Sequence, residues 1–194
     1  MLIDIVKANR SYRGYDESYV FTKEELKDLV NITRFTPSSV NKQPFKYYIA
    51  CEKDKVQLIQ SMTKWAAALP EMTLPHPGMC PTGFIVICQD LNINPNPFRY
   101  STDIGIVAQT LLLYAAEKGL GGCMIGNFNA DEVKEKLSLS DNFHPVLIIA
   151  LGKPSEKIVL TDLENGGDTK YYRDENDVHY VPKRKLEDII INRD

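Results

Sequence analysis

Apolar residues recur at helical spacing in several segments of the chain and form short continuous runs in others. Some helical segments have marked ends: Thr22 and Glu25 have the spacing of a capping box, and Pro37 prevents the same helix from continuing. The continuous runs are rich in β-branched and aromatic residues, which favours strands. This pattern predicts helices at residues 2–9, 22–36, 54–65, 103–118, 129–137 and 182–191, and strands at 45–51, 84–88, 121–125 and 145–151.

Three segments show neither the helical spacing of apolar residues nor a continuous apolar run. Residues 66–82 contain four prolines, and we expect a loop or lid there; residues 91–101 are also irregular. Residues 161–177 are polar and too sparse in apolar side chains to fold alone, so we expect an arm laid over another surface. The helix that follows is expected to hold Pro182 in its first turn, where proline is tolerated.

The helix expected at residues 103–118 is apolar nearly all round. Such a helix must be covered on most sides, by the sheet of its own chain or also by a partner subunit. Strands and helices alternate along the rest of the chain, and 194 residues suffice for one domain with a sizeable core. We therefore predict a single domain over residues 1–194.

Composition and charge exclude several classes of function. The formal net charge of −3 gives no general attraction for nucleic acid or for an anionic membrane. No apolar run approaches the roughly 20 residues needed to span a bilayer, and Asp4 interrupts the apolar N-terminal stretch, so we expect a cytoplasmic protein. The four cysteines contain no C-x-x-C pair, which favours structural thiols over a metal site or a disulfide.

Common catalytic templates are missing from the sequence. It has no G-x-S-x-G, H-E-x-x-H or P-loop motif, and its three histidines are scattered. The glycines at 119, 121, 122 and 126 do not form a dinucleotide fingerprint, because Met124 stands where the third glycine is required and the cluster follows a helix rather than a strand. The pattern therefore excludes a Rossmann-type nucleotide site.

A run of cations near the C-terminus indicates a bound anion instead. Lys183, Arg184 and Lys185 are expected in the first turn of the last helix, where the helix dipole disfavours cations by roughly a few tenths of a kcal/mol each. A phosphate bound there would reverse this cost, because three cations and free backbone N–H groups would face a dianion. The alternative is a solvated basic surface.

Two more polar clusters lie in the N-terminal part of the chain. Arg10 and Arg13 flank Ser11 just beyond the first helix, where both guanidinium groups can reach a ligand. Residues 37–44, P-S-S-V-N-K-Q-P, place two hydroxyls and two amides between prolines, which gives many hydrogen-bonding groups at low conformational cost. The alternative for this segment is a structural loop that satisfies its own backbone.

These clusters belong to a longer series of motifs in a fixed order. The series is R-S-Y-R at 10–13, P-S-S-V-N-K-Q-P at 37–44, D-I-G-I-V-A-Q-T-L-L-L-Y-A-A-E-K-G-L-G-G at 103–122, I-G-N-F at 125–128, A-L-G-K-P at 150–154 and V-P-K-R-K-L-E-D at 181–188. With these motifs in this order, the chain resembles the FMN-dependent nitroreductase family over nearly its whole length.

The resemblance implies a fold and an assembly. The fold is α+β, a three-layer α/β/α sandwich with a mostly antiparallel central sheet. The assembly is an intertwined homodimer with two FMN sites at the subunit interface, in which the C-terminal arm, about residues 161–194, wraps the partner. Helix 103–118 would then form much of the dimer core, which would explain its apolar surface.

The same resemblance assigns cofactor contacts. The phosphate, ribityl chain and pyrimidine end of FMN would be bound by Arg10, Ser11 and Arg13, with Lys183, Arg184 and Lys185 completing the phosphate site. The partner subunit would contribute Pro37, Ser38, Ser39, Asn41 and Gln43. Backbone N–H groups around Gly126 and Asn127 would face flavin N5 and O4.

The implied activity is oxidoreduction by a ping-pong cycle. Hydride would pass from NADH or NADPH to flavin N5, and then to an electron-poor acceptor such as a nitroaromatic or a quinone. No acid–base residue is required, and Arg13 and the Gly126 amide would tune the two ends of the flavin ring. The alternatives are a flavin reductase or another redox activity on the same scaffold, and a flavin-binding protein without turnover.

Two features depart from the family pattern. Many members have a second arginine where this chain has Asn9, so one phosphate contact is missing, and the cations at 183–185 could replace it. The chain is also short for the family, so we expect reduced insertions around the acceptor pocket. Trp65, residues 66–82 and residues 98–100 are candidate walls of that pocket, with plain packing as the alternative.

Overall fold

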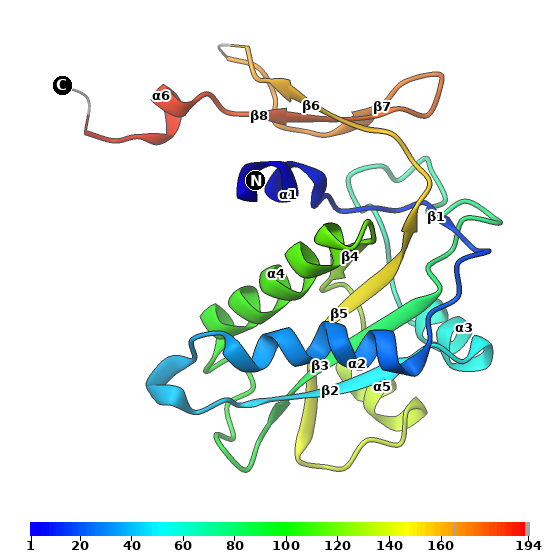
Figure 1. Ribbon diagram of the computed structural model, residues 1–194, viewed down its shortest axis with the longest axis vertical. Coiled ribbons are helices and arrows are strands. Elements are labelled where there is room, and N and C mark those ends of the chain that lie inside the picture. Colours follow the sequence, from blue (N-terminus) through cyan, green and yellow to red (C-terminus); the bar gives the residue numbers. More distant parts are fainter. Residues whose placement is uncertain (165, 193–194) are drawn as a thin grey trace.

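The computed structural model describes residues 1–164 and 166–192, in which helices and strands alternate through most of the chain (Figure 1). The helices are α1 (Leu2–Ala8), α2 (Lys23–Asn31), α3 (Lys53–Ser61), α4 (Ser101–Glu117), α5 (Ala130–Lys136) and α6 (Leu186–Ile189), with short 3-10 helices at Ile32–Phe35 and Ser39–Asn41. The strands are β1 (Tyr15–Asp16), β2 (Phe45–Ala50), β3 (Gly83–Asp90), β4 (Gly121–Ile125), β5 (Phe143–Pro154), β6 (Ile158–Asp162), β7 (Tyr172–Arg173) and β8 (His179–Lys183).

Five strands form an antiparallel sheet in the centre of the molecule. Their order is β1-β5-β3-β2, and β4 also pairs with β5. Side chains of β3 alternate between the two faces: Ile85 and Ile87 join the apolar cluster with α2 and α4, whereas Phe84 and Val86 join the cluster with α3 and α5. Both faces of β3 are therefore buried, as its continuous apolar run indicates.

Helices cover both faces of this sheet, α2 and α4 on one side and α3 and α5 on the other. The predicted α/β/α architecture with an antiparallel central sheet is confirmed. Helix α4 buries Ala108 and Leu111 in the core, whereas Gly105 and Gln109 are exposed in the single chain. The apolar surface of α4 is thus covered mainly by its own sheet and by neighbouring helices.

Local sequence signals explain where two of the helices begin. The Thr22 hydroxyl accepts a hydrogen bond from the Glu25 backbone N–H at 3.2 Å, and the Glu25 carboxylate accepts one from the Thr22 N–H at 2.8 Å. The predicted capping box is confirmed. Asn129 caps α5 with its side-chain oxygen. The helix predicted at 54–65 is wrong at its end, because α3 stops at Ser61 and Thr63 forms a β-bridge with Phe128.

The two glycines at the start of β4 allow close packing of the backbone. A Cβ atom at Gly121 would lie 2.4 Å from the ring of Tyr12, and one at Gly122 would lie 2.5 Å from the carbonyl oxygen of Ala150. The Tyr12 N–H donates to the Gly122 carbonyl at 3.1 Å, so the segment after α1 runs directly beside β4. These glycines therefore bring the N-terminal segment against the sheet.

The C-terminal part folds differently from the prediction. Strands β6, β8 and β7 form a second sheet, in which β8 pairs in parallel with β6 and antiparallel with β7. Figure 1 shows this sheet above α1, on the side away from β2. The helix predicted at 182–191 is wrong, because Pro182 lies in β8 and α6 covers four residues. Strand β7 pairs only with residues 179 and 180, so β8 is an edge at Pro182, where proline is tolerated.

The cysteines are free in the described part of the chain. Burial raises the pKa of the Cys88 thiol to about 12 and that of Cys123 to about 11, so both are protonated at neutral pH. Among residues 1–164 and 166–192, no three His, Cys, Asp or Glu side chains gather as metal ligands. None of the helices in these ranges is long and apolar enough to cross a bilayer.

Candidate functional site

A cavity of about 350 Å³ opens between the segment after α1, strand β4, helix α4 and the C-terminal sheet. This volume lies within the range of sites that hold small molecules and cofactors. Four of the predicted binding residues meet here: Arg10, Ser11, Arg13 and Lys183. The remaining polar lining consists of Asn9, Gln109, Tyr171 and His179.

Each of the two arginines has a buried donor atom that is unpaired in the described part of the chain. Arg10 donates from its guanidinium to the Val6 carbonyl at 2.9 Å, and Arg13 donates to the Ser11 carbonyl at 3.2 Å. The Nε atoms of both arginines are buried without a hydrogen-bond partner among the described residues. Buried polar groups are rarely left unpaired, so these donors fit a ligand rich in oxygen atoms.

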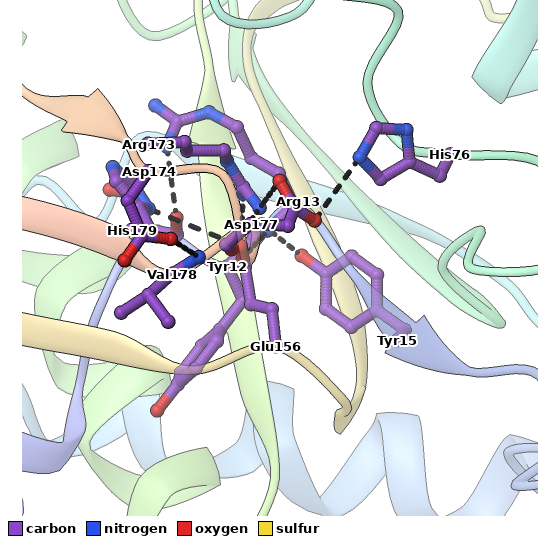
Figure 2. A network of polar contacts seen from close by, with 11 residues as sticks. Tyr12, Arg13, Tyr15, His76, Glu156, Arg173, Asp174, Asp177, Val178 and His179 are labelled. Atoms are coloured by element: carbon purple, nitrogen blue, oxygen red, sulfur yellow. Dashed lines mark hydrogen bonds and ion pairs between the residues drawn. The ribbon is translucent and has the colours of Figure 1, made fainter.

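Arg13 is held from two sides. Its guanidinium lies over the ring of Tyr171, 4.8 Å from the centroid, and its backbone N–H donates to the carboxylate of Glu156. Glu156 also pairs with Arg173, and the two side chains are 2% and 3% exposed. Figure 2 shows how this network connects the segment after α1 with β7 and β8.

The same network reaches the proline-rich segment at 66–82. Arg173 pairs with Asp177 at 3.0 Å, and the other carboxylate oxygen of Asp177 lies 3.2 Å from Nε2 of His76 (Figure 2). A buried arginine between two carboxylates thus ties three separate segments together. The wall of the cavity formed by the C-terminal sheet is fixed by this connection.

Strand β8 presents one of its faces to the cavity. His179, Val181 and Lys183 line it, as expected for alternate residues of a strand, whereas Tyr180 stacks on Tyr172 outside. Burial, together with the positive charges of Arg13 and Arg173, lowers the pKa of His179 to about 4. The imidazole is therefore neutral at neutral pH.

The cationic run at 183–185 does not form one cluster. Lys183 ends β8 and lines the cavity, Arg184 is exposed, and Lys185 precedes α6. The prediction that all three stand in the first turn of a helix is wrong, because β8 pairs with β6 through Lys183. The helix-dipole argument for a phosphate therefore fails, and the binding role of Arg184 and Lys185 stays a prediction.

The loop before β2 borders a second cavity, of about 190 Å³. The Ser38 hydroxyl and the Ser39 backbone N–H both donate to the buried carboxylate of Asp103, each at 2.8 Å. Gln43 donates from its amide to the Asn41 side-chain oxygen at 3.1 Å. In the single chain, Asp103 thus anchors this loop from the first turn of α4.

The exposed tip of this loop is strained. Val40, Asn41 and Gln43 have φ angles of 50°, 52° and 48°, in the left-handed region. This conformation is unfavourable above all for the β-branched Val40, which is 86% exposed. Pro37 lies at the base of the same loop and lines the second cavity. Strain of this kind is often found in segments that contact a ligand or a partner.

In Figure 1, the loop before β2 lies near the first turn of α4, whereas the segment after α1 lies near the opposite end of the helix. Asp103, in the first turn of the helix, borders the second cavity, whereas Gln109 and Leu112 line the first. The two cavities share no lining residue in the described part of the chain, although Val107, which borders the second, is two positions from Gln109, which borders the first. The polar clusters predicted for one cofactor therefore do not meet within a single chain.

Gly126 and Asn127 follow β4 without lining either cavity. Gly126 continues the alternation of Gly122 and Met124, which do line the first cavity. A Cβ atom at Gly126 would meet no other atom within 4 Å, so its surroundings are open. The Asn127 carbonyl accepts a hydrogen bond from the Lys64 N–H at 3.0 Å, which fixes the turn.

The residues proposed as walls of an acceptor pocket have different positions. Trp65 packs against the apolar cluster beneath α3 and α5, and Tyr100 is buried in the cluster beneath α2 and α4. Phe98 is 70% exposed. Leu69 and Met72, from the proline-rich segment, line a third cavity of about 410 Å³ that Tyr171 also borders. The proline-rich segment therefore borders a cavity, as predicted for a pocket wall.

Sequence reasoning missed several residues of the first cavity. The alternation in H-Y-V-P-K could have predicted a strand with His179 and Lys183 on one face. The sequence contains no signal for Glu156, because its contact with Arg13 spans 143 positions. Tyr171 lies in a polar segment that has no periodicity.

Comparisons with known proteins agree with this architecture. The sequence profile described as the Nitroreductase family matches residues 6–153. An oxygen-insensitive NADPH nitroreductase from Helicobacter acinonychis (strain Sheeba) is 27% identical, over 77% of this chain and 85% of that protein.

Two solved structures share the fold. A nitroreductase family protein from Streptococcus pneumoniae TIGR4 covers 100% of both chains with a TM-score of 0.69 and 18% identity. A protein from Exiguobacterium sibiricum 255-15, solved in complex with FMN, covers 80% of this chain and 89% of its own, with a TM-score of 0.65 and 19% identity.

Proposed function

The chain belongs to the nitroreductase family, and from this premise we propose that it is an FMN-dependent oxidoreductase. It would transfer hydride from NADH or NADPH to an electron-poor small molecule such as a nitroaromatic or a quinone. One observation carries the proposal: Arg10, Ser11, Arg13 and Lys183 converge on one cavity, in which the buried Nε donors of both arginines have no partner within residues 1–164 and 166–192. Bound FMN supplies hydride transfer at its N5 atom.

The residues of the cavity fit the two ends of this cofactor. Arg10 and Lys183 come from two elements that face each other, and with Ser11 they would neutralise and hydrogen-bond a phosphate. Arg184 and Lys185 stay assigned to the phosphate as a prediction. Asn9 is 8% exposed and lines the same cavity, where an amide can donate to the phosphate without adding charge.

Arg13 would bind the other end of the cofactor. Its stacking on Tyr171 and the Glu156 hydrogen bond to its backbone N–H restrict its orientation. A fixed positive charge beside the N1/C2=O end of the flavin favours the negative charge that reduction places there. The backbone N–H groups around Gly126 and Asn127 would face N5 and O4 from the open end of β4.

A second copy of the chain would complete the site. Pro37, Ser38 and Gln43 border the second cavity and not the cavity of the arginines, so in this proposal their loop, which also holds Ser39 and Asn41, reaches the cavity of a partner in a homodimer. The C-terminal arm, about residues 161–194 of the single domain, would contact the same partner. A cytoplasmic location remains part of this proposal.

The proposed reaction is tested by assaying the purified holoenzyme with each nicotinamide cofactor and three acceptors. Oxidation of NADH or NADPH that depends on a nitroaromatic or a quinone supports the proposal. Oxidation with free flavin alone would instead identify a flavin reductase. A yellow protein that oxidises neither cofactor with any acceptor would contradict enzymatic turnover.

A further inference from the structure

One buried polar side chain of the first cavity has no role in the proposed function. His179 is 2% exposed, yet neither of its ring nitrogens has a hydrogen-bond partner among the described residues. Removing an imidazole from water without replacing its hydrogen bonds costs free energy. A ligand in the cavity that His179 lines would supply the missing partner.

The surroundings of the ring favour one tautomer. Nδ1 lies 4.0 Å from a carboxylate oxygen of Glu156, too far for a hydrogen bond but close enough for the negative charge to favour a hydrogen on Nδ1. Nε2 then carries the lone pair. The cations Arg13 and Arg173 oppose a second proton on the ring, and Asp177 favours it more weakly.

This tautomer determines what His179 can bind. A lone pair on Nε2 accepts a hydrogen bond from an O–H or N–H group, whereas a phosphate dianion has no hydrogen to donate. Along β8, His179 lies four residues from Lys183, about 13 Å at the usual rise of a strand. Both Arg13 and His179 contact the ring of Tyr171, so His179 lies beside Arg13 rather than beside the phosphate cations.

We propose that His179 is a binding residue that recognises the uncharged part of the flavin, with Nε2 accepting a hydrogen bond from a ribityl hydroxyl or from the ring N3–H. This inference rests on the proposed function and assigns a further contact within the same site. The contact also accounts for the polar side chain at position 179 of β8, where the next residue that lines the cavity, Val181, is apolar.

The inference is tested by flavin titrations of the full-length apoprotein, followed by quenching of flavin fluorescence. His179→Leu removes the acceptor, and we expect a roughly tenfold loss of affinity for both FMN and riboflavin. His179→Gln places an oxygen near the position of Nε2 and should retain most of the affinity. His179→Asn is too short to reach that position and should resemble the leucine variant.

Titration with lumiflavin identifies which group of the flavin His179 contacts, and a variant at Lys183 serves as the control. Lumiflavin has no ribityl chain, so a loss that persists with lumiflavin assigns the contact to N3–H, and a loss confined to FMN and riboflavin assigns it to a hydroxyl. Lys183→Met is the matched control on the same strand and should weaken binding of FMN much more than binding of riboflavin.

Two results would overturn the inference. One is unchanged affinity of both His179→Leu and His179→Asn for FMN and riboflavin. The other is a loss for FMN alone, which would make His179 a phosphate contact. If the unmodified protein binds neither flavin, it is the proposed function that fails. Circular dichroism and thermal unfolding of each variant separate a lost contact from a lost fold.

Discussion

Arg13 is the residue on which the proposed redox chemistry depends most. Replacing it by alanine removes the positive charge that we propose to lie beside the flavin ring, but keeps Arg10, Ser11 and Lys183, the proposed phosphate contacts, in the same cavity. We expect the variant to keep part of its FMN affinity and to be reduced by NADH or NADPH at least roughly tenfold more slowly. Anaerobic stopped-flow at saturating FMN measures this rate, and Arg13→Lys, which retains the charge, should be less affected. An unchanged rate for Arg13→Ala would exclude the tuning role.

His179 makes the stability of the apoprotein depend on pH. The pKa of its imidazole is about 4 in the folded chain and about 6.5 when unfolded, so the unfolded chain binds the proton first as the pH falls. The free energy of unfolding should therefore decrease below pH 6.5, by about 2 kcal/mol between pH 7 and pH 5.

Urea unfolding at pH 7 and pH 5 measures this dependence. His179→Gln should lose it, whereas the control His144→Gln, which lies in β5 of the central sheet beside Phe98, should keep it. Equal pH dependence of the original chain and His179→Gln would show that this imidazole does not titrate as described.

At the residue scale, the sequence predicts candidate binding residues that lie close together in the chain. Arg10, Ser11 and Arg13 are adjacent and follow a helix end, so they could be predicted as one cluster, and the structure places them in one cavity. Glu156 could not be predicted, because the backbone N–H that it accepts from belongs to a segment 143 positions away.

At the element scale, Asp103 couples helix α4 to the loop before β2. Asp103→Ala would leave the Ser38 hydroxyl and the Ser39 N–H without their acceptor. We expect the free energy of unfolding to fall by about 1–3 kcal/mol and the FMN affinity of the proposed dimer to fall roughly fivefold or more, because the loop loses its defined position.

A matched control separates these two effects. Thr22→Ala removes the cap of α2 and should cost about 1 kcal/mol, without contact to either cavity. Urea unfolding and flavin titration of both variants give the comparison. If Thr22→Ala weakens FMN binding as much as Asp103→Ala does, stability alone accounts for the loss.

Helix α2 was predictable because apolar periodicity and a capping box agreed, and strand β3 was predictable from its continuous apolar run. The last helix was mispredicted because one of its residues had two possible roles. Pro182 fits the first turn of a helix, but it also fits the edge of a sheet, and pairing of β8 with β6 decides for the strand. Long-range pairing of this kind cannot be read from local sequence. The incorrect helix also placed Lys183 in a different element from His179, whereas in the structure both residues lie on the same face of β8.

At the scale of the whole molecule, exposed apolar side chains lie at both chain ends. Leu2 and Ile3 of α1 are 70% and 50% exposed, and Ile189 and Ile191 are 60% and 98% exposed. We expect a second chain to cover them, so light scattering should give about twice the 22.0 kDa of one chain. The double variant Ile189→Asp, Ile191→Asp should shift the protein toward the monomer and weaken FMN binding. A monomer that binds FMN with full affinity would contradict a site shared between subunits.

The order of motifs predicted the fold of the whole molecule, and the family profile matches most of the chain. The motifs could not show that the loop at 37–43 and the arginines border two different cavities of the chain. That separation depends on how α4 packs on the sheet, which is a property of the folded chain.

The visible spectrum of the purified protein tests the central claim most directly. After incubation with FMN and removal of free cofactor, the account predicts a yellow protein with a flavin absorption band that NADH or NADPH bleaches under anaerobic conditions. A colourless protein that retains no FMN would contradict it.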